Sequence, residues 1–536
     1  MKNIAIIGAG PTGIYTLHAL LKATEPMAIS IFEKEAEAGV GMPYSDEENS
    51  RLMLANIASI EIPPLRETYL DWLRRQDAAR LARYGVDRDG LHDRQFLPRI
   101  LLGDYFRDRF LALVAEARAR GLPVTVRESC EVSDIEAGPD GVRLHTDGRP
   151  EPDLFDLVVI ATGHVWPDDS EATRSYFPSP WSGLVDARIP ACRVGIMGTS
   201  LSAIDAAMAV VVQHGRFVEE EDEGLSFARD AQSEDLSISL MSRSGILPEA
   251  DFYCPIPYEP LDIATETAIA AEIAQGPEGL LDRIFTLVQR QIAASDPAWA
   301  ERIDLATLDA DSFAKAYFAD RERFDPFRWA AYNLREVERN KRDCHTVPWR
   351  YAILRMHEQV QEIVPHLNEH DRERFDGGLC KVFVDNYAAV PSESIRRLLA
   401  LHRAGLIEVL ELGQDYDMAV RDDHTVITTD EGTRVFDVFI DARGQKALET
   451  ADLPFPTLRR QMIEAGDEIP EVADDYTLTS PEAARGRIAF GALPWLMHDQ
   501  PFVQGITAAC EIGTAIARAA TGPAARRRKR LVHPGW

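Results

Sequence analysis

Basic residues are scarce in this sequence relative to acidic ones. Lys and Arg number 58 against 87 Asp and Glu in 536 residues, so the formal net charge is −29. An acidic excess of this size disfavours binding to nucleic acid and to anionic membrane surfaces. The one basic run, 526–530, lies in the segment 521–536, which we interpret as a solvated tail. We therefore expect the partner to be a small-molecule substrate.

Cysteines and long apolar runs are also scarce. The six cysteines are scattered and form no C-x-x-C pair, which in so long a chain is typical of reduced thiols. No apolar stretch approaches the roughly 20 residues that cross a bilayer. The strand pattern that begins directly after Met1 and Lys2 leaves no room for a signal peptide. These absences predict a cytoplasmic protein.

Missing motifs narrow the chemistry further. No C-x4-C pair follows the glycine-rich segment near the N-terminus, which argues against a disulfide reductase of the glutathione-reductase type, and no G-x-S-x-G elbow suggests a hydrolase. His366, Glu369 and His370 fit the H-x-x-E-H zinc pattern. However, Pro365 precedes them and no third ligand can be identified, so we expect no metal site.

A strand and a glycine-rich turn open the chain. Residues 3–7 (NIAII) form a short apolar run typical of a buried parallel strand, and GAGPTG follows before the helical pattern of IYTLHALLKA. In this G-x-G-x-x-G motif Gly8 permits a tight turn, Gly10 lets the backbone approach a pyrophosphate, and Gly13 allows close packing of helix on strand. The phosphates would lie at the helix N-terminus. The motif predicts a dinucleotide site.

An acidic residue follows at the spacing that this site requires. The strand 28–32 (AISIF) ends at Glu33, 20 residues after Gly13 (33 − 13), where a carboxylate accepts hydrogen bonds from an adenosine ribose. The glycine motif alone does not distinguish FAD from NAD. Three later strand patterns end in or before glycine: 156–164 (DLVVIATGH), 436–444 (FDVFIDARG) and 487–494 (RIAFGALP). This order resembles the two-dinucleotide flavoproteins, in which FAD lies along a discontinuous domain, and it therefore favours FAD.

A second turn of this kind occurs at 195–205 (GIMGTSLSAID). Gly198, Ser200 and Ala203 hold its three glycine positions, between a strand pattern and a helix pattern. Serine is small and can donate to a phosphate, and alanine is an accepted replacement at the packing position. The next strand, 235–243, ends at Ser242 and Arg243, and an arginine there is the expected partner of a 2′-phosphate. The turn predicts a site for NADP(H), with a turn that has lost its ligand as the alternative.

The region between about 255 and 404 has helical apolar spacing, as in 279–294 and 392–405. We interpret it as a helical insertion, and no internal repeat is evident. Polar and aromatic residues gather in 252–260, 345–355 and 385–394, which makes these stretches candidates for a substrate pocket. From such segments we select Arg350, Tyr387 and His498 as candidate catalytic residues, with a structural role, which is the commoner one for such residues, as the alternative.

Several longer segments carry a resemblance to a known family. They include AGVGMPYSDEENS, MLANIASIEIPP, HDRQFLPRILLG, YFPSPWSG, LMSRSGILPEADFYCPIPYEP and GALPWLMHDQPFVQG, and they extend to about residue 520. Together with the motifs above, they resemble the FAD-NAD(P)-binding family related to flavin-dependent N-hydroxylases and nitrosuccinate synthases. The resemblance implies FAD, with Asn56 and Arg99 near it, and the second turn predicts NADP(H) as the other cofactor. The candidate cofactor-binding residues are Gly8, Gly10, Pro11, Thr12, Gly13, Glu33, Lys34, Gly41, Asn56, Arg99, Val132, Thr162, Gly163, Gly198, Thr199, Ser200, Ser242, Arg243, Arg443, Gly444, Gly491 and Gln504.

The sequence therefore predicts an α/β protein with two Rossmann-like dinucleotide-binding domains and a largely helical insertion. The expected boundaries are 1–188 and 411–520 for the two parts of the FAD domain, 189–254 for the NADP domain, 255–410 for the helical insertion and 521–536 for the tail. The expected function is an FAD-dependent NAD(P)H oxidoreductase, in its more specific form a single-component monooxygenase of a small polar or amine substrate. The alternatives are a reductase or dehydrogenase with an acceptor other than oxygen, and a flavin-binding redox sensor or scaffold.

Overall fold

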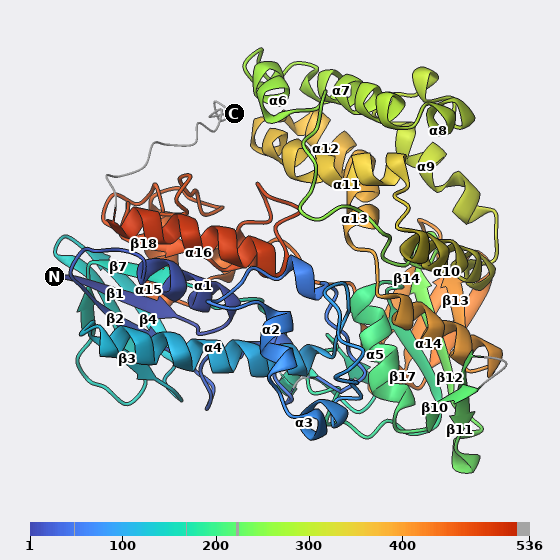
Figure 1. Ribbon diagram of the computed structural model, residues 1–536, viewed down its shortest axis with the longest axis horizontal. Helices are drawn as coiled ribbons and strands as arrows, with labels where there is room; N and C mark the ends of the chain where they lie inside the picture. The colour runs from blue at the N-terminus through green and yellow to red at the C-terminus, as the bar shows by residue number, and fades with distance from the viewer. Residues whose placement is uncertain (48, 168, 221–223, 522–536) are drawn as a thin grey trace. The chain divides into compact units, whose positions relative to one another are not determined.

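The computed structural model describes residues 1–47, 49–167, 169–220 and 224–521, and the predicted basic tail lies outside these residues except for Thr521. The chain divides into two compact units (Figure 1). Unit 1 comprises 1–51, 57–165 and the chain from Gln445 onward, and unit 2 comprises 52–56 and 166–444. Among the described residues, no helix has both the length and the apolar character needed to span a membrane.

Unit 1 is built on a five-stranded parallel sheet in the order β18-β7-β1-β2-β3. Its strands are apolar because both faces are covered: Ile4 to Ile7 of β1 are all buried. A three-stranded antiparallel sheet, β4-β5-β6, precedes β7 in the chain. The strands are β1 (Lys2–Ile7), β2 (Met27–Phe32), β3 (Val124–Arg127), β4 (Val132–Gly138), β5 (Gly141–Thr146), β6 (Asp153–Phe155), β7 (Leu157–Ile160) and β18 (Ile488–Phe490).

The helices of unit 1 include one that comes from the end of the chain. Helix α16 runs beside α1, as the red and dark blue ribbons of Figure 1 show, and their backbones approach closely because a Cβ atom at Gly513 would lie only 2.6 Å from the backbone nitrogen of Thr16. The first and last segments of the chain therefore form one packed layer. The helices are α1 (Pro11–Leu20), α2 (Tyr69–Arg74), α3 (Ala78–Ala82), α4 (Arg99–Ala119), α15 (Pro456–Glu464) and α16 (Gly505–Thr521).

Unit 2 repeats the plan of unit 1. Its parallel sheet has the order β13-β12-β9-β17-β8, and a three-stranded antiparallel sheet, β14-β15-β16, directly precedes β17 as β4-β5-β6 precedes β7. A separate hairpin joins β10 and β11. The strands are β8 (Tyr176–Phe177), β9 (Arg193–Met197), β10 (Gly215–Glu220), β11 (Gly224–Arg229), β12 (Ser237–Ser242), β13 (Ile407–Glu411), β14 (Asp417–Val420), β15 (Thr425–Thr429), β16 (Gly432–Phe436) and β17 (Val438–Asp441).

The predicted helical insertion forms between β12 and β13. Its helices are amphipathic: in α7 the buried side chains recur at helical spacing, for example at Leu281, Ile284, Phe285 and Val288. The helices of unit 2 are α5 (Leu201–Val211), α6 (Glu266–Ile273), α7 (Leu280–Ser295), α8 (Pro297–Arg302), α9 (Phe313–Glu322), α10 (Pro326–Asp343), α11 (Pro348–Val360), α12 (Glu369–Gly377), α13 (Leu379–Tyr387) and α14 (Ser392–Arg403). The fold class expected from the sequence is confirmed.

One segment lies in a different unit from the one expected. Residues 411–444 were expected in the second part of the FAD domain, but they belong to unit 2, where β17 pairs with β9 in parallel register. The apolar pattern of 436–444 fits a buried strand of either parallel sheet. The packing of Met197, Met241, Phe436 and Phe439 in one buried cluster attaches the segment to unit 2.

Candidate functional site

The first glycine turn joins β1 to α1 in the predicted way. Gly8 has φ +95°, and a Cβ atom there would lie 2.4 Å from the carbonyl oxygen of Ala161, so only glycine fits. A Cβ atom at Gly13 would lie 2.2 Å from the carbonyl oxygen of Gly8. Pro11 is at the first helical position, and no side chain caps the helix N-terminus at Gly10. The backbone N–H groups of this first turn of α1, which includes Thr12, are the groups that bind phosphate in such turns.

Gly10 differs from its two neighbours in the motif because the protein itself does not require glycine there. Its φ is −75°, and a Cβ atom would make only an ordinary contact, 3.4 Å from the Cα of Gly41. Gly41 has φ +82° and packs closely against Gly10 and Pro11. Since the local structure would accept alanine at position 10, the glycine there leaves room for a group outside the protein.

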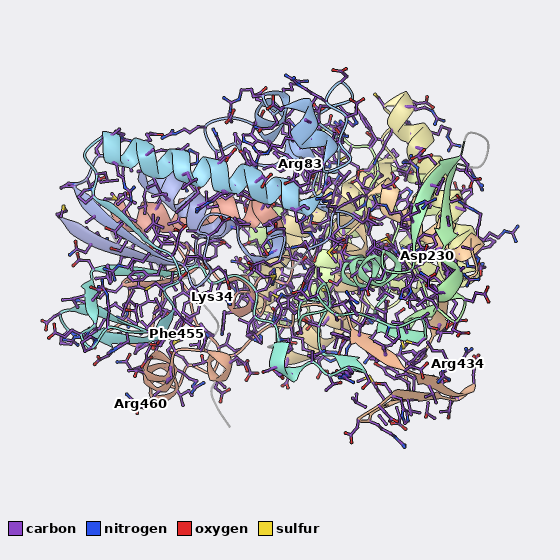
Figure 2. All side chains as sticks on the ribbon, turned by 90° about the horizontal axis from the view of Figure 1, so that it is seen from below. Lys34, Arg83, Asp230, Arg434, Phe455 and Arg460 are labelled. Carbon is purple, nitrogen blue, oxygen red and sulfur yellow. The ribbon has the colours of Figure 1, made fainter. Side chains whose placement is uncertain are left out.

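Glu33 directly follows β2 and connects it to the glycine turn. The carboxylate is 8% exposed and accepts two backbone N–H groups, from Ala9 at 2.9 Å and from Glu35 at 3.1 Å. Lys34, labelled in Figure 2, is exposed and forms an ion pair with Glu35 at 3.4 Å. The acid predicted to bind the ribose therefore lies directly beside the predicted pyrophosphate loop.

The carboxyl ends of β7 and β18 meet the same turn. The N–H of Ala161 donates to Ile7 at 2.8 Å, and Thr162 and Gly163 follow. The N–H of Gly491 donates to the carbonyl oxygen of Ile160 at 2.8 Å, and a Cβ atom at Gly491 would lie 2.8 Å from a methyl carbon of Thr12. Ligands of parallel sheets bind at this edge.

The remaining candidates in the flavin set are more dispersed. Arg99 begins α4 and donates to the side chain of Asn49 at 3.3 Å. Val132 begins β4, next to the segment in which the N–H of Cys130 donates to the carbonyl oxygen of Glu33 at 2.8 Å. Gln504 is exposed just before α16. Asn56 is exposed and belongs to unit 2. The structure brings together the glycines, Glu33 and the residues after β7 and β18, whereas Asn56 belongs to the other unit.

The second glycine turn joins β9 to α5. Gly198 has φ +129°, and a Cβ atom there would lie 2.9 Å from the carbonyl oxygen of Ala442. Thr199 follows, and the exposed Ser200 is the N-cap residue of α5, where its side chain makes no capping hydrogen bond. Ala203, at the third position, is fully buried. Residue by residue, this turn repeats the geometry of the first.

Arg243 follows β12 and is exposed. Its guanidinium has no ion-pair or hydrogen-bond partner in the part of the chain that the structure describes. The hydroxyl of Ser242 is engaged, since it accepts the N–H of Gly245 at 3.1 Å. The unpaired arginine beside the second turn is therefore available to an anion.

The segment after β17 belongs to this second turn and not to the first. The N–H of Ala442 donates to the carbonyl oxygen of Met197 at 2.8 Å, which places Arg443 and Gly444 after the strand next to β9. The Arg443 guanidinium binds Asp441 at 2.5 and 2.9 Å. Residues 442–444 follow β17, which pairs with β9, just as residues 161–163 follow β7, which pairs with β1. The similarity of DLVVIATG and FDVFIDARG is a sequence feature that indicates one such segment for each sheet.

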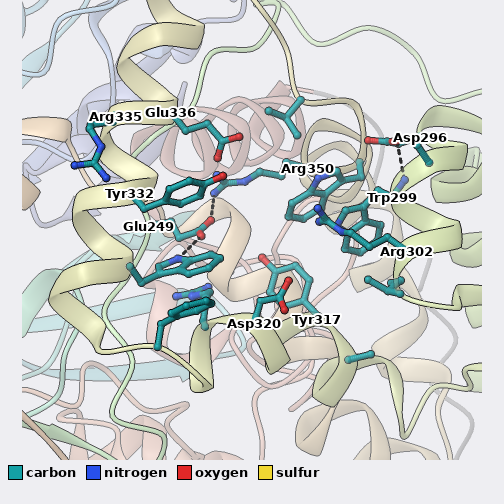
Figure 3. Close-up of a pocket in the computed structure, with 18 of the residues that line it drawn as sticks. Glu249, Asp296, Trp299, Arg302, Tyr317, Asp320, Tyr332, Arg335, Glu336 and Arg350 are labelled. Atoms are coloured by element: carbon teal, nitrogen blue, oxygen red, sulfur yellow. Dashed lines mark hydrogen bonds and ion pairs between the residues drawn. The ribbon is translucent and has the colours of Figure 1, made fainter.

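The three candidate catalytic residues do not all belong to one unit. His498 is in unit 1, whereas Arg350 and Tyr387 are in unit 2. Arg350 lines a cavity of about 890 Å³ among the helices of the insertion (Figure 3). Tyr387 stacks on His357, with ring centroids 5.4 Å apart, and is not among the residues that line this cavity.

The partner of Arg350 is a residue that sequence reasoning missed. Glu249 is 6% exposed, forms an ion pair with Arg350 at 2.7 Å and accepts the indole N–H of Trp329 at 2.9 Å. Burial raises the pKa of Glu249, but the charges of Arg350 and Arg321 more than offset this and hold the pKa below its ordinary value. Glu249 is therefore ionised at neutral pH. It lies in LPEADFYCP, just before a stretch that sequence analysis selected, but nothing in the sequence marks its pairing with a residue far along the chain.

The zinc pattern is not formed on one helix. His366 ends the 3-10 helix η6 (Gln361–His366), and Asn368 caps α12, in which Glu369 and His370 lie. The two histidines therefore do not share a helix face. No group of three or more metal-ligating side chains occurs among the described residues.

Comparison with known proteins identifies the family. The chain is 64% identical over 531 residues to the uncharacterized protein YdhS of Escherichia coli strain K12, and the match covers 99% of both chains. The chain belongs to the YdhS family. Within it, residues 265–387 match the YdhS-like middle domain, and residues 5–165 match an FAD-NAD(P)-binding domain.

More distant similarities are to two proteins of known structure. The ornithine N-hydroxylase of Kutzneria sp. 744 is 14% identical with a TM-score of 0.49, over 97% of this chain and 99% of that chain. The L-lysine 6-monooxygenase of Pseudomonas syringae is 12% identical with a TM-score of 0.45, over 97% and 98%.

The YdhS-family chain has sites that fit the two cofactors. The Gly8–Gly13 turn, with a glycine at position 10 that the protein does not itself need, fits a dinucleotide pyrophosphate, and Glu33 fits the ribose. The Gly198–Ala203 turn fits a second dinucleotide. The cofactors of the family, FAD and NAD(P), therefore match the two turns of this chain.

Proposed function

We propose that this protein is an FAD-dependent NAD(P)H oxidoreductase, with FAD in unit 1 and NADPH in unit 2. One observation carries the proposal. Two strand–glycine–helix turns occur, each with its own parallel sheet, and in unit 1 the glycine at position 10 leaves room for a close-lying ligand. When bound, FAD would accept a hydride from the nicotinamide and pass two electrons to an acceptor.

The residues of the chain would bind and orient the two nucleotides. The N-terminus of α1 would hold the FAD pyrophosphate, and Glu33, fixed by the N–H of Ala9, would accept the ribose hydroxyls. In unit 2 the N-terminus of α5 would hold the second pyrophosphate. The unpaired guanidinium of Arg243 would bind a 2′-phosphate, which favours NADPH over NADH.

In its more specific form, the proposal is a single-component monooxygenase of a small polar or amine substrate. The six cysteines form no C-x-x-C or C-x4-C dithiol that could carry electrons away from the flavin. This favours direct transfer to oxygen or to a bound small molecule. A reductase with another acceptor is the second form, and both share the two nucleotide sites.

The test is anaerobic reduction of the purified protein. Protein loaded with FAD should lose its visible flavin absorbance on addition of NADPH, and more slowly with NADH. Protein that takes up no FAD on reconstitution would contradict the whole proposal, whereas FAD that neither nicotinamide reduces would contradict only the site in unit 2. Readmission of air together with candidate small amines then separates the two forms: incorporation of an oxygen atom into the amine indicates the monooxygenase, whereas formation of hydrogen peroxide alone indicates simple reoxidation of the flavin.

A further inference from the structure

We propose that the cavity in the helical insertion binds a small aromatic carboxylate, whose anionic group contacts the guanidinium of Arg350 and the exposed arginines at the rim. The proposal adds a binding site to the two nucleotide turns. It does not depend on flavin reduction, because every residue that it uses lies in unit 2.

The cavity has the size of a small-molecule site. Its volume of about 890 Å³ lies in the range of ligand pockets. Helix α10, which carries Tyr332 and Arg335, forms one side, and α8, which carries Trp299 and Arg302, forms the opposite side (Figure 3). Helix α9 closes the lower side in this view, and Arg350 extends into the centre from α11.

The floor of the cavity holds buried donors that the protein leaves unused. The side chains of Arg350 and Arg321 are 4% and 5% exposed, and the Nε–H of each has no hydrogen-bond partner among the described residues. Their other nitrogens bind Glu249 at 2.7 Å and Asp385 at 2.6 Å. A guanidinium stays charged and presents its donors in a planar fork suited to a carboxylate. Both Nε atoms are closed to solvent, so an anionic ligand would instead reach Arg350 at Nη1, which makes no hydrogen bond among the described residues and is not closed in this way.

Aromatic rings line the walls. Trp329 lies between Phe324 and Tyr332, with ring centroids 5.8 Å from each, and these two outer rings are 48% and 54% exposed. On the opposite side Trp299 stacks on Trp349 at 4.4 Å. Exposed aromatic side chains gathered at one pocket mark a recognition surface for an apolar, planar group.

Three arginines at the rim of the cavity are available to an anion. Five arginines line it against four carboxylates, in a chain whose formal net charge is −29. Arg302, Arg328 and Arg335 are exposed at the rim, and their guanidinium groups form no ion pair within the described chain. Two of the carboxylates are already engaged: Glu249 with Arg350, and Asp296 with the N–H of Trp299 at 3.0 Å. Since Arg321 is paired with Asp385, the three rim arginines stand against Asp296, Asp320 and Glu336, and their guanidinium groups without ion pairs are the ones available to a carboxylate.

Calorimetric titration of the FAD-loaded protein without nicotinamide tests the proposal. Indole-3-acetate is the probe, indole-3-acetamide is its neutral counterpart, and butyrate is a carboxylate without a ring. We expect the acid to bind at least about tenfold more tightly than the amide, since charge-assisted hydrogen bonds are lost with the charge, and more tightly than butyrate. Equal affinity for the acid and the amide would overturn the proposal. Absence of binding heat with the acid at about 10 mM would also overturn it, because that concentration exceeds the Kd of a millimolar ligand.

Two variants on one helix localise the binding. Arg335→Gln removes a rim guanidinium, and Arg339→Gln removes an exposed one on α10 that does not line the cavity. We expect the first to weaken indole-3-acetate binding about threefold or more and the second to leave it unchanged. Arg350→Lys should weaken it further, because lysine keeps a charge opposite Glu249 but loses the planar fork. Equal effects of the Arg335 and Arg339 substitutions would contradict the location.

Discussion

The carboxylate of Glu33 accepts the backbone N–H of Ala9 at 2.9 Å, which fixes the acid at the end of β2 beside the first glycine turn. Ala9 follows β1, and Glu33 follows the neighbouring β2. Their hydrogen bond holds the glycine turn and the acid together at the predicted dinucleotide site. The N–H of Ala9 holds the Glu33 carboxylate in place, and the same hydrogen bond restrains the glycine turn.

Replacement of Glu33 should therefore weaken flavin binding. We expect Glu33→Ala to raise the Kd for FAD about ten- to a hundredfold, because charge-assisted hydrogen bonds from the loop and the ribose are lost together. Fluorescence titration of the deflavinated protein measures this. Glu35→Ala, at an exposed side chain two residues on, serves as the control and should bind FAD as the unchanged protein does. Equal losses in both variants would mean that the carboxylate at 33 has no special role.

Gly10→Ala should separate folding from binding. The backbone at Gly10 has φ −75° and room for a Cβ atom, so the thermal unfolding midpoint of the FAD-free variant should match that of the unchanged protein. Its affinity for FAD should fall about tenfold or more, because a methyl group forced into a close contact costs roughly 1–3 kcal/mol. Gly13→Ala, where the Cβ atom would meet the carbonyl oxygen of Gly8 at 2.2 Å, should instead destabilise the fold. An FAD-free Gly10→Ala protein that unfolds early would contradict the assignment.

Arg243→Gln should change the nicotinamide preference. Loss of the guanidinium should raise the KM for NADPH about ten- to a hundredfold, since hydrogen bonds to a charged phosphate are lost, and should leave the KM for NADH nearly unchanged. Arg216→Gln, on the separate hairpin of unit 2, is the control. Steady-state oxidation rates with each nicotinamide give both values. An equal rise in KM for NADPH and for NADH would show that Arg243 does not bind the 2′-phosphate.

Ser200→Gly tests the second turn. Ser200 makes no capping hydrogen bond, so its loss should cost only a few tenths of a kcal/mol of stability. Removal of its side chain lets the backbone approach a pyrophosphate, and we expect the Kd for NADPH to fall about threefold, which equals roughly 0.6 kcal/mol. Flavin content should stay the same. A loss of flavin instead would mean that this turn binds the other cofactor.

The Glu249–Arg350 pair should make stability dependent on pH. The pKa of Glu249 is lowered in the folded protein, so its contribution is fully present above its ordinary value of 4.5 and is lost as pH falls through the folded value. At neutral pH Glu249→Gln should destabilise by about 3–5 kcal/mol, because Arg350 is left buried without its counter-charge. Thermal unfolding at pH 7 and at lower pH should show that the difference in stability between the unchanged protein and Glu249→Gln becomes smaller below pH 4.5. Glu336→Gln, at the rim of the same cavity, should change stability little at either pH.

Features set by neighbouring residues in the chain could be predicted from the sequence. The two turns, with Gly8, Glu33 and Ser200, depend on local spacing, and the structure places each at its expected strand end. Features set by distant pairing could not be predicted. The pattern of 436–444 fits either parallel sheet, and only the packing of Phe439 against Met197 and Met241 decides that it belongs to unit 2. Of the cavity, sequence analysis selected the stretch 345–355, in which Trp349 and Arg350 line it, but it did not identify the rest of the lining, which comes from other helices and from Glu249.

The close packing of α16 on α1, where Gly513 meets Thr16, has a consequence for biosynthesis. A ribosome makes β1 and α1 first, but β18 and α16, which complete the same sheet and helix layer, emerge last. All the strands and helices of unit 2 are made in the interval. The glycine turn between β1 and α1 is therefore surrounded by all its neighbouring elements only after β18 and α16 have been made. A nascent chain arrested before residue 488 should be unable to retain FAD, even though every glycine of the first turn has already been translated.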